Sequence, residues 1–454
     1  MDKNTVFAKL ASRTPLFDIM PMVARKRIMG TESEYGVQNT LLGDNPIIAY
    51  DRLPAMLQNG GEVYEDRGHV EYASPETANI VAAVAYYEAG KVICHRERYS
   101  PELYCNNNDW YDNTFGAHEN YFTCAQRAVW PRLIPFLIAR TVLCGAGWVN
   151  EKSRFEISQR AHTICQAQHP DTTTNRPVLN LRPESLARVK GFDRLHLICG
   201  DATMSEVSTF LRLGTTSCIL EMLELNALPE ITYNETYAPA DIKMISNREW
   251  HLRGVTSGPR SVLALLALYL ERAIELFSHR DEVTDALLII WEDTLHKLES
   301  DHQKLWRRLD WATKLFLLNT FDAVVNDSTG DWARAQDMAY HSLNPKEGLY
   351  YYLAQQGEME RIVSDELIVH AMYEPPSDTR AYARGKTVQL LEERGGERVL
   401  CANSWDHLSI IDVAASGYNR VIRTPNPRRY LSIPMPDPRE TYTHLVEKVR
   451  KELS

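Results

Sequence analysis

The chain has 454 residues, of which 44% are hydrophobic and 24% charged, and its formal net charge at pH 7 is −10. This is the composition of a globular protein, long enough for a large core with an accessory domain or for two or three domains. The acidic balance argues against a general nucleic-acid-binding protein, which would need a basic surface.

Three further features predict a cytoplasmic protein with no membrane partner. The strongest apolar run, Val262 to Leu270, is far shorter than the ~20 residues that span a bilayer. The N-terminal sequence lacks the continuous apolar segment of a signal peptide. The eight cysteines are scattered without a CxxC pair, which is typical of buried free thiols in a reducing compartment.

The first part of the chain reads as a lead-in followed by strands. Residues 1–26 form a variable lead-in, and residues 28–37, IMGTESEYGV, predict a strand. Residues 59–76 predict two short strands around a turn at Arg67 and Gly68. A further strand is predicted at 194–201, where alternation places Arg194 and His196 on one face.

Helices dominate the rest. Thr203 and Glu206 fit a capping box at the start of a helix. Three long amphipathic helices are predicted at 259–278, 281–299 and 303–320, with the stripes of helices that pack on a sheet. Residues 374–385 contain two prolines and a glycine and indicate a linker or domain edge. The sequence therefore predicts an α+β fold with a large domain at 27–385 and a small α+β domain at 386–454.

Acidic side chains gather at the predicted strands. Glu32 and Glu34 lie two residues apart, as do Tyr64 and Asp66, so each pair points to one side of its strand. Glu71 follows directly after the turn. Carboxylates on one face repel each other unless a cation lies between them, and such hard oxygen donors suit Mg²⁺. The alternative is the solvated edge of a sheet.

His118 and His196 are candidates to extend this site, although a hydrogen-bonded core histidine is the alternative for each. Glu206 is a further candidate that a capping role explains equally well. The sequence has no GxSxG elbow, no HExxH and no GxxxxGK[ST] phosphate loop. If ATP binds, the sequence predicts that it binds on a metal-coated sheet.

Several long motifs resemble the depupylase and Pup-ligase family. They are GTESEYG (30–36), NGGEVYEDRGHVEYASPE (59–76), FGAHENY (115–121), SQRA (158–161), RLHLICGDATMSE (194–206) and SWDHLSIID (404–412). The resemblance implies a glutamine synthetase-like curved antiparallel sheet cradle, packed by helices, with a small C-terminal domain that contributes to the nucleotide site.

The resemblance also implies the chemistry. Members of this family act on the C-terminal glutamate or glutamine of Pup, a small disordered protein modifier, with ATP and Mg²⁺ as cofactors. Ligases activate the glutamate γ-carboxylate through a γ-glutamyl phosphate and join it to a substrate lysine. Depupylases hydrolyse the same isopeptide bond. A Pup-like modifier and its conjugates are therefore the expected partners.

Particular residues match functional positions of the family. Glu32, Tyr64 and Glu71 match magnesium ligands, and Asp66 matches the catalytic aspartate. Ser74 and Trp405 match nucleotide contacts. His118, His196 and Arg160 also lie in matching motifs. The resemblance implies that the two histidines belong to the metal site and that Arg160 contacts the nucleotide. Arg182 remains as a residue able to meet a substrate carboxylate.

The direction of the reaction depends on finer features. The short spacing from Asp66 to Glu71 resembles the depupylase branch, since ligases carry one extra residue there. The long loop that depupylases insert after the EYG motif is absent, and Glu62 stands where the family has a nucleotide-contacting arginine. The resemblance favours a depupylase-like hydrolase. A Pup ligase, a small-molecule carboxylate–amine ligase and a non-catalytic relative remain as alternatives.

Overall fold

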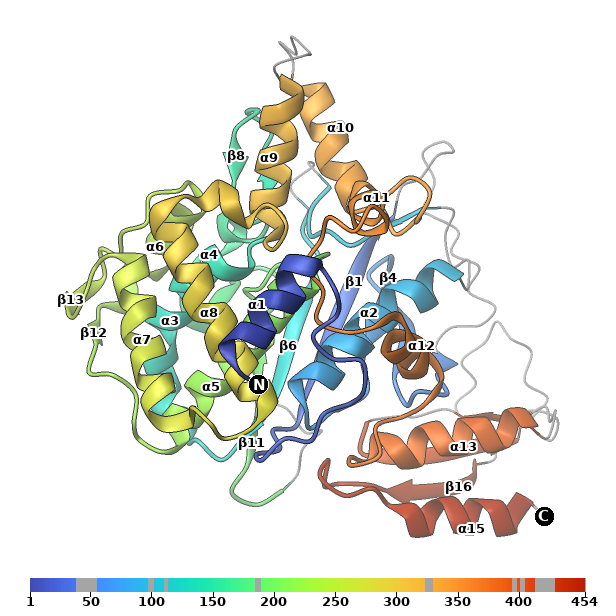
Figure 1. Cartoon of the computed structure of the whole chain (residues 1–454). Coiled ribbons are helices and arrows are strands. Elements are labelled where there is room, and N and C mark those ends of the chain that lie inside the picture. The colour runs from blue at the N-terminus through green and yellow to red at the C-terminus, as the bar shows by residue number, and fades with distance from the viewer. Residues whose placement is uncertain are drawn as a thin grey trace.

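The computed structural model describes residues 1–37, 55–96, 102–109, 113–183, 189–322, 330–393, 398–400, 405–412 and 429–453. Most of the segment between Val37 and Gln58, where the sequence lacks the loop that depupylases insert, lies outside these ranges. Within them, seven antiparallel strands form the central sheet, with helices on one side of it (Figure 1). The strands are β1 (Met29–Val37), β2 (Ala55–Met56), β3 (Glu62–Asp66), β4 (His69–Ala73), β5 (Leu103–Tyr104), β6 (Ala117–Thr123) and β11 (Asp193–Leu197).

The strand order is β11-β6-β1-β4-β3-β2, and β5 pairs with the end of β1. The long strand β1 therefore lies between β4 and β6. Glu34 stands opposite Glu71 on β4, and Glu32 stands opposite His118 on β6. Because facing residues of neighbouring strands point to the same side, this register collects the predicted acidic and histidine side chains on one face.

The hairpin between β3 and β4 is closed by the predicted turn at Arg67 and Gly68. Both residues have positive φ, at 52° and 90°, as a tight two-residue hairpin turn requires. Asp66 and His69 form the last pair before the turn, and Tyr64 stands opposite Glu71. The turn thus sets the register that brings Tyr64, Asp66 and Glu71 together.

The other face of the sheet is apolar and carries the core. Tyr35, Val63, Val70 and Tyr72 are buried there, beneath helix α2 (Ile80–Arg96). Helix α5 (Glu206–Glu224) packs on α2 and β6, and α12 (Asp365–Tyr373) packs on α2. One face of the sheet is therefore sealed by helices, and its polar face is left for chemistry.

Two of the three long helices predicted to pack on the sheet lie in a second layer instead. Helices α7 (Val262–Phe277) and α8 (Glu282–Ser300) pack on each other and on α5, as Figure 1 shows. The third is split into η5 (His302–Leu305) and α9 (Asp310–Asp322). Between them, Arg308 is buried in ion pairs with Asp293 and Glu360. An amphipathic stripe predicts that one face of a helix is buried, but it does not predict which element covers that face.

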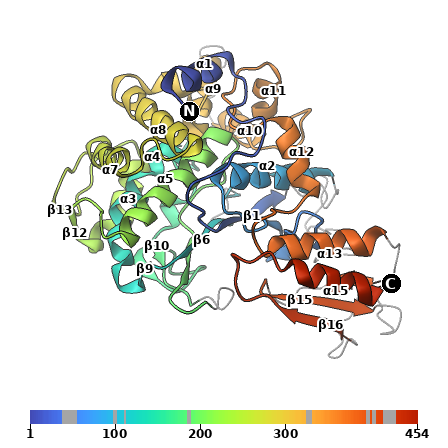
Figure 2. The ribbon, with the colours of Figure 1, turned by 60° about the horizontal axis from the view of Figure 1, so that its bottom comes forward.

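The C-terminal unit is a small sheet covered by two helices (Figure 2). Strands β14 (Arg398–Leu400), β15 (His407–Asp412) and β16 (Arg429–Pro434) pair in this order beside α13 (Ala381–Glu393) and α15 (Thr443–Leu453). Its core includes Val388, Ile433 and Val449, and Met56 of β2 joins it. The boundary predicted at 385/386 falls inside α13, so the secondary structure begins this unit at Ala381.

The lead-in is packed against the helical layer. Helix α1 (Lys3–Ser12) buries Val6 and Leu10, packs on α8, and is followed by Phe17, whose N–H donates to Ile362 O at 2.9 Å. None of the helices in the described ranges is long and apolar enough to cross a bilayer.

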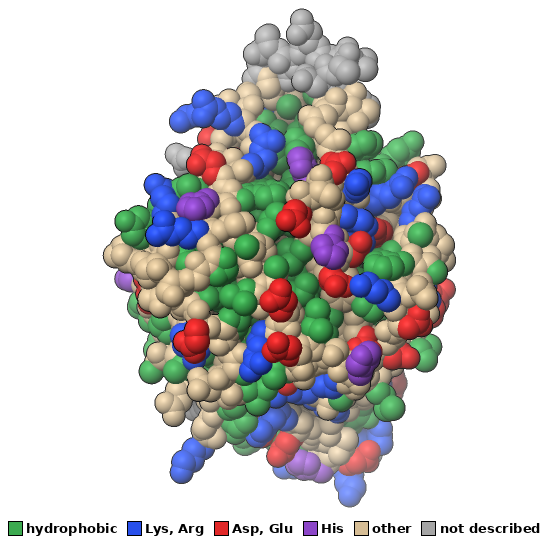
Figure 3. All heavy atoms as spheres, turned by 60° about the vertical axis from the view of Figure 1, so that its left-hand side comes forward, with side chains coloured by type: hydrophobic (Ala, Val, Ile, Leu, Met, Phe, Trp, Pro, Cys, Tyr) green, Lys and Arg blue, Asp and Glu red, His purple; other side chains and the backbone are tan. Residues whose placement is uncertain are grey.

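On the helical side of the molecule, acidic and basic side chains are interspersed among hydrophobic ones (Figure 3).

Short elements complete the described chain. The remaining elements are η2 (Arg127–Leu133), α3 (Ile134–Ala139), α4 (Thr141–Cys144), β7 (Trp148–Val149), β8 (Phe155–Glu156), η3 (Ala161–Thr163), β9 (Gln166–His169), β10 (Pro177–Asn180), β12 (Thr232–Tyr233), η4 (Glu235–Tyr237), α6 (Ala238–Ser246), β13 (Val255–Ser257), α10 (Asp331–Tyr340) and α11 (Leu349–Gln355).

Candidate active site

The polar face of the sheet carries two groups of potential metal donors. In the first, Glu32, His118 and His196 bring one donor atom each to within 4.8 Å of one another. In the second, Glu34, Asp66 and Glu71 do the same, and Tyr64 hydrogen-bonds Glu71. The structure thus brings the predicted residues together on one face. It also divides them, since both histidines lie with Glu32 and not with Asp66. Their roles as ligands remain predictions.

Glu32 is held by several donors. Its Oε1 accepts from Arg194 Nη2 at 3.0 Å and Asn120 Nδ2 at 3.1 Å, and its Oε2 lies 3.1 Å from His118 Nδ1. His196 Nε2 is 3.5 Å from the same Oε2. Burial opposes ionisation of Glu32, but the charge of Arg194 and these hydrogen bonds outweigh it and hold the pKa of Glu32 well below its usual range. Glu32 is therefore an anion.

Glu71 has the opposite environment. It is 3% exposed and faces other carboxylates across the strands. Burial and the charge of Glu32 raise the pKa of Glu71 well above its usual range, with smaller contributions from Glu34 and Asp66. Burial and Glu71 likewise raise the pKa of Tyr64. Such crowding of like charges is costly unless a cation neutralises it.

This donor set fits a divalent cation. Carboxylate and phenol oxygens are the hard donors that Mg²⁺ prefers, and a cation among them would offset the burial and the neighbouring charges that raise the pKa of Glu71. The space between the two groups depends on Gly116, where a Cβ would lie 2.3 Å from His118 Nε2 and 2.7 Å from Glu34 Oε1. Any larger residue would close the gap between the groups.

A pocket of about 550 Å³ adjoins the first group. It lies between the sheet and the C-terminal unit, and Ser74 and Trp405, the two predicted nucleotide contacts, both line it along with Glu32. Ser74 Oγ also accepts from Thr31 N at 2.9 Å, so its position is fixed by β1. The pocket's remaining walls are Ile28, Met29, Gly30, Thr31, Ala73, Glu76, Asn120, Tyr121, Phe122, Arg194, Arg380 and Pro438.

Glu76 ties the C-terminal unit to the sheet beside this pocket. Arg380 Nε donates to Glu76 Oε1 at 2.6 Å, and Arg384 pairs with its Oε2 while its guanidinium lies 4.7 Å from the centre of the Trp405 ring. Burial would favour the neutral acid, but Arg384 and Arg380 outweigh it and lower the pKa of Glu76 to about 2. The pocket wall formed by Arg380 and Trp405 therefore depends on this carboxylate.

We expect Glu76→Gln to destabilise the fold by about 3 kcal/mol, because it leaves two buried guanidinium groups short of a counter-charge. Since the pKa of Glu76 is lowered, its stabilising contribution is present above about pH 4.5 and is lost as the pH falls towards about 2. Urea unfolding at several pH values measures both effects. The control is Glu374→Gln, which removes the more exposed pair with Lys386 and should cost less than about 1 kcal/mol. Equal losses of stability in both variants would contradict this role of Glu76 in holding Arg380 and Arg384.

Two predicted residues lie apart from the pocket. Arg160 is buried, donates to Thr114 Oγ1 at 3.2 Å and to the carbonyl of Phe115, and is electrostatically coupled to Glu34. Burial lowers its pKa to about 10. Arg160 therefore stands on the Glu34 side and not among the residues that line the pocket. Arg182 follows β10, where its N–H donates to Asn180 Oδ1 at 2.6 Å. The predicted roles of Arg160 and Arg182 stay predictions.

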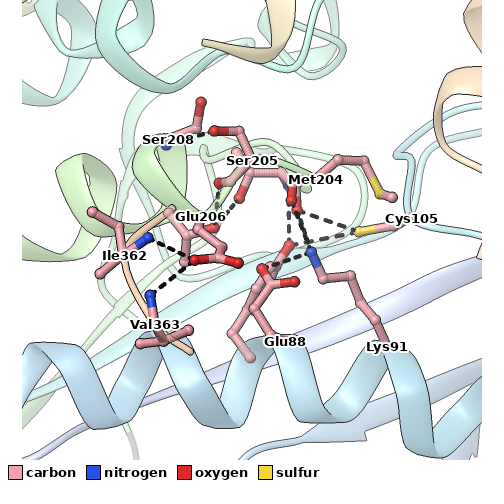
Figure 4. Close-up of polar contacts among 12 residues, drawn as sticks. Glu88, Lys91, Cys105, Met204, Ser205, Glu206, Ser208, Ile362 and Val363 are labelled. Atoms are coloured by element: carbon pink, nitrogen blue, oxygen red, sulfur yellow. Dashed lines mark hydrogen bonds and ion pairs between the residues drawn. The ribbon is translucent and has the colours of Figure 1, made fainter. Parts of the chain in front are cut away.

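Glu206 lies on the far side of the sheet. Ser205, not Thr203, caps helix α5, accepting from Ser208 N, so the predicted capping box is wrong. Glu206 Oε2 instead accepts from Ile362 N at 2.7 Å and Val363 N at 2.9 Å, and Figure 4 shows it reaching that segment near Glu88 and Lys91 of α2. Its carboxylate anchors a chain segment and is no part of the acidic face.

Several polar residues of the site were not singled out by sequence reasoning. Asn120 and Arg194 hold Glu32, and Glu76, Arg380 and Arg384 build the pocket's far wall. The alternation that placed Arg194 beside His196 was a sufficient signal for Arg194. No local pattern connects Glu76 with Arg380, because the contact joins residues about 300 positions apart.

The chain is similar to known proteins over most of its length. The family model described as Pup-ligase protein matches residues 43–409. A depupylase of Acidothermus cellulolyticus is 34% identical over 377 residues, which cover 77% of this chain and 74% of the relative. Pup–protein ligases of Kribbella flavida and Acidimicrobium ferrooxidans are 31% and 33% identical, covering 86% and 87% of this chain and 94% and 95% of their own lengths.

Solved structures give the same result. The complex between Pup and its ligase PafA matches with a TM-score of 0.81 at 26% identity, covering 95% of this chain and 93% of that one. PafA in complex with ADP matches with a TM-score of 0.73 at 26% identity, covering 92% and 96%. These matches confirm the predicted α+β fold, which the chain shares with PafA over nearly its whole length. With its matched family model and these relatives, the chain belongs to the Pup-ligase protein family.

Proposed function

We propose that this protein is an ATP- and Mg²⁺-dependent enzyme that acts on the amide bond between the side chain of a C-terminal glutamate of Pup, or a Pup-like modifier, and an amine. The observation that carries the proposal is the placement of two donor groups and a pocket side by side on one sheet face. The family supports it, because its relatives are named as depupylase and Pup–protein ligases and one neighbour holds ADP.

Glu32, Tyr64 and Glu71, with Glu34, His118 and His196 beside them, are the residues that would hold divalent cations. Bound there, Mg²⁺ would neutralise phosphate charge and polarise the reacting oxygen. The protein's own contribution is a rigid frame, since every one of these side chains stands on a strand of one sheet. The pocket beside Ser74 and Trp405 would take the nucleotide.

Asp66 is the proposed general base. It is half-buried at the end of β3, next to Glu34 and Glu71 and away from the residues that line the nucleotide pocket. In hydrolysis it takes a proton from the water that adds to the amide carbonyl and passes a proton to the departing amine. In the reverse direction it takes the proton from an attacking lysine. One carboxylate at this position therefore serves both directions.

We propose hydrolysis, the depupylase-like direction, as the main activity. The support is the tight hairpin that pairs Asp66 with His69 and leaves the short spacing to Glu71 that resembles depupylases. Ligation is the second candidate, because the Pup–protein ligases match more of this chain and of their own length than the depupylase does.

The experiment is to incubate the protein with ATP, Mg²⁺ and a purified Pup conjugate, and separately with free Pup and an acceptor protein. Hydrolysis predicts release of free Pup from the conjugate, with no conjugate formed in the second mixture. Accumulation of conjugate from separate components would establish ligation instead. If neither reaction occurs while ATP is consumed with glutamate and a small amine, the substrate is not a Pup-like protein.

A further inference from the structure

Arg194 of β11 is a pocket-lining cation held by a candidate metal ligand. Its Nη2 lies 3.0 Å from Glu32 Oε1, and its Nε donates to Asn120 Oδ1 at 2.8 Å. The side chain is 15% exposed and reaches the same pocket as Ser74 and Trp405. The guanidinium therefore lies where the pocket meets the first donor group.

Two arginines line the pocket within the described chain, and their partners differ. Arg380 pairs with Glu76, which also takes Arg384 and belongs to neither donor group. Arg194 pairs with Glu32, which a cation in the first group would also need. A cation in the first donor group would therefore act on the ion pair of Arg194 and not on that of Arg380.

Glu62 lies on β3 two residues before Tyr64, on the same face of the sheet, and supplies no positive charge there. Burial raises the pKa of Glu62 to about 7, against the charge of nearby Arg384. A carboxylate there supplies no attraction for phosphate. Arg194 and Arg380 are the guanidinium groups among the described residues that line the pocket and could meet phosphates there.

We propose that Arg194 exchanges partners: it pairs with Glu32 when no metal is bound and with the phosphates of the nucleotide when a divalent cation is bound by Glu32. This rests on the proposed nucleotide-dependent function. A divalent cation bound by Glu32 and the histidines would withdraw charge from the carboxylate that holds Arg194 and would repel the guanidinium, whereas a triphosphate attracts both. The planar fork of arginine suits phosphate oxygens as well as it suits a carboxylate.

The exchange predicts effects of opposite sign in Arg194→Gln. Its affinity for Mg²⁺ and a non-hydrolysable ATP analogue should fall about tenfold or more, because a charge-assisted hydrogen bond to phosphate is lost. Its affinity for Mn²⁺ without nucleotide, measured by electron paramagnetic resonance, should rise about threefold or more, because a positive charge beside Glu32 is removed. A residue that only supported the fold would weaken both.

The controls separate this inference from the proposed function. Arg127→Gln removes a guanidinium that does not line the pocket and that pairs with Asp193, the neighbour of Arg194 on β11. This variant should change neither affinity. Arg194→Lys keeps the charge without the fork, so both affinities should lie between those of wild type and Arg194→Gln; it decides the matter if the glutamine variant does not fold. If wild type binds the analogue and both Arg194 variants bind it equally well, or if both affinities fall together, the inference is overturned. If wild type binds no nucleotide, the proposed function falls with it.

Discussion

Asp66→Asn is expected to reduce turnover of a Pup conjugate by at least about 10²-fold, and up to about 10⁴-fold, the usual contribution of a general base. The amide keeps the size of the carboxylate but cannot accept the proton. Nucleotide affinity should stay within about twofold of wild type, since Asp66 is not among the residues that line the pocket. Single-turnover kinetics and calorimetry with an ATP analogue measure the two effects separately.

The matched control for Asp66 is its neighbour Glu65, which is exposed on the opposite side of the same strand and accepts from Gly68 N at 3.1 Å. Glu65→Gln should leave the rate unchanged. An Asp66→Asn enzyme that retained wild-type turnover would rule out this residue as the base and would move attention to Glu34, which belongs to the same group and, like Glu71, is not among the residues that line the pocket.

Glu71→Gln is expected to separate folding from function. At neutral pH the metal-free variant should be more stable than wild type, because a buried like-charged carboxylate has been removed. Its affinity for Mg²⁺ with nucleotide should fall at least about tenfold, since the loss of one charged ligand should cost about 1.4 kcal/mol or more of binding free energy. Thermal unfolding with and without Mg²⁺ and ATP analogue measures both, because a ligand that binds the folded state raises its stability.

The stability of the metal-free protein should also depend on pH. The folded-state pKa of Glu71 is raised, so the folded protein holds the proton more tightly than the unfolded chain. Metal-free wild type should therefore lose stability as the pH rises above about 4.5 towards the folded pKa, and Glu71→Gln should lose less. The gap between the two proteins should widen with pH and close again when Mg²⁺ is added to wild type. A gap that narrowed with rising pH would contradict the buried-carboxylate explanation.

Local patterns were sufficient to predict the sheet face. Two-residue spacing gave the common side of Glu32 and Glu34, and the turn at Arg67 and Gly68 gave the hairpin that carries Tyr64, Asp66 and Glu71. The pairing of β1 with β6 was not readable from spacing. That register places His118 opposite Glu32, and the pairing of β11 with β6 adds His196, in a group distinct from that of Asp66.

The errors arose where a residue has a distant partner. Gly385 is part of the predicted linker, yet it lies inside α13, where a glycine is required because a Cβ would be 2.3 Å from Gln58 O, on the segment before β3. Glu206 fits a local cap but bonds to residues 361–363. The pocket wall at Trp405 and Arg380 likewise requires the docked C-terminal unit, which no local pattern predicts.

The central claim is that one sheet face binds divalent cations together with a nucleoside triphosphate. Its most direct test is a crystal structure of the protein with Mn²⁺ and a non-hydrolysable ATP analogue, with manganese located by anomalous scattering. We predict manganese bound by Glu32 and Glu71, with the nucleotide in the pocket lined by Ser74 and Trp405. Manganese absent from both donor groups, or nucleotide bound elsewhere at full occupancy, would contradict the claim.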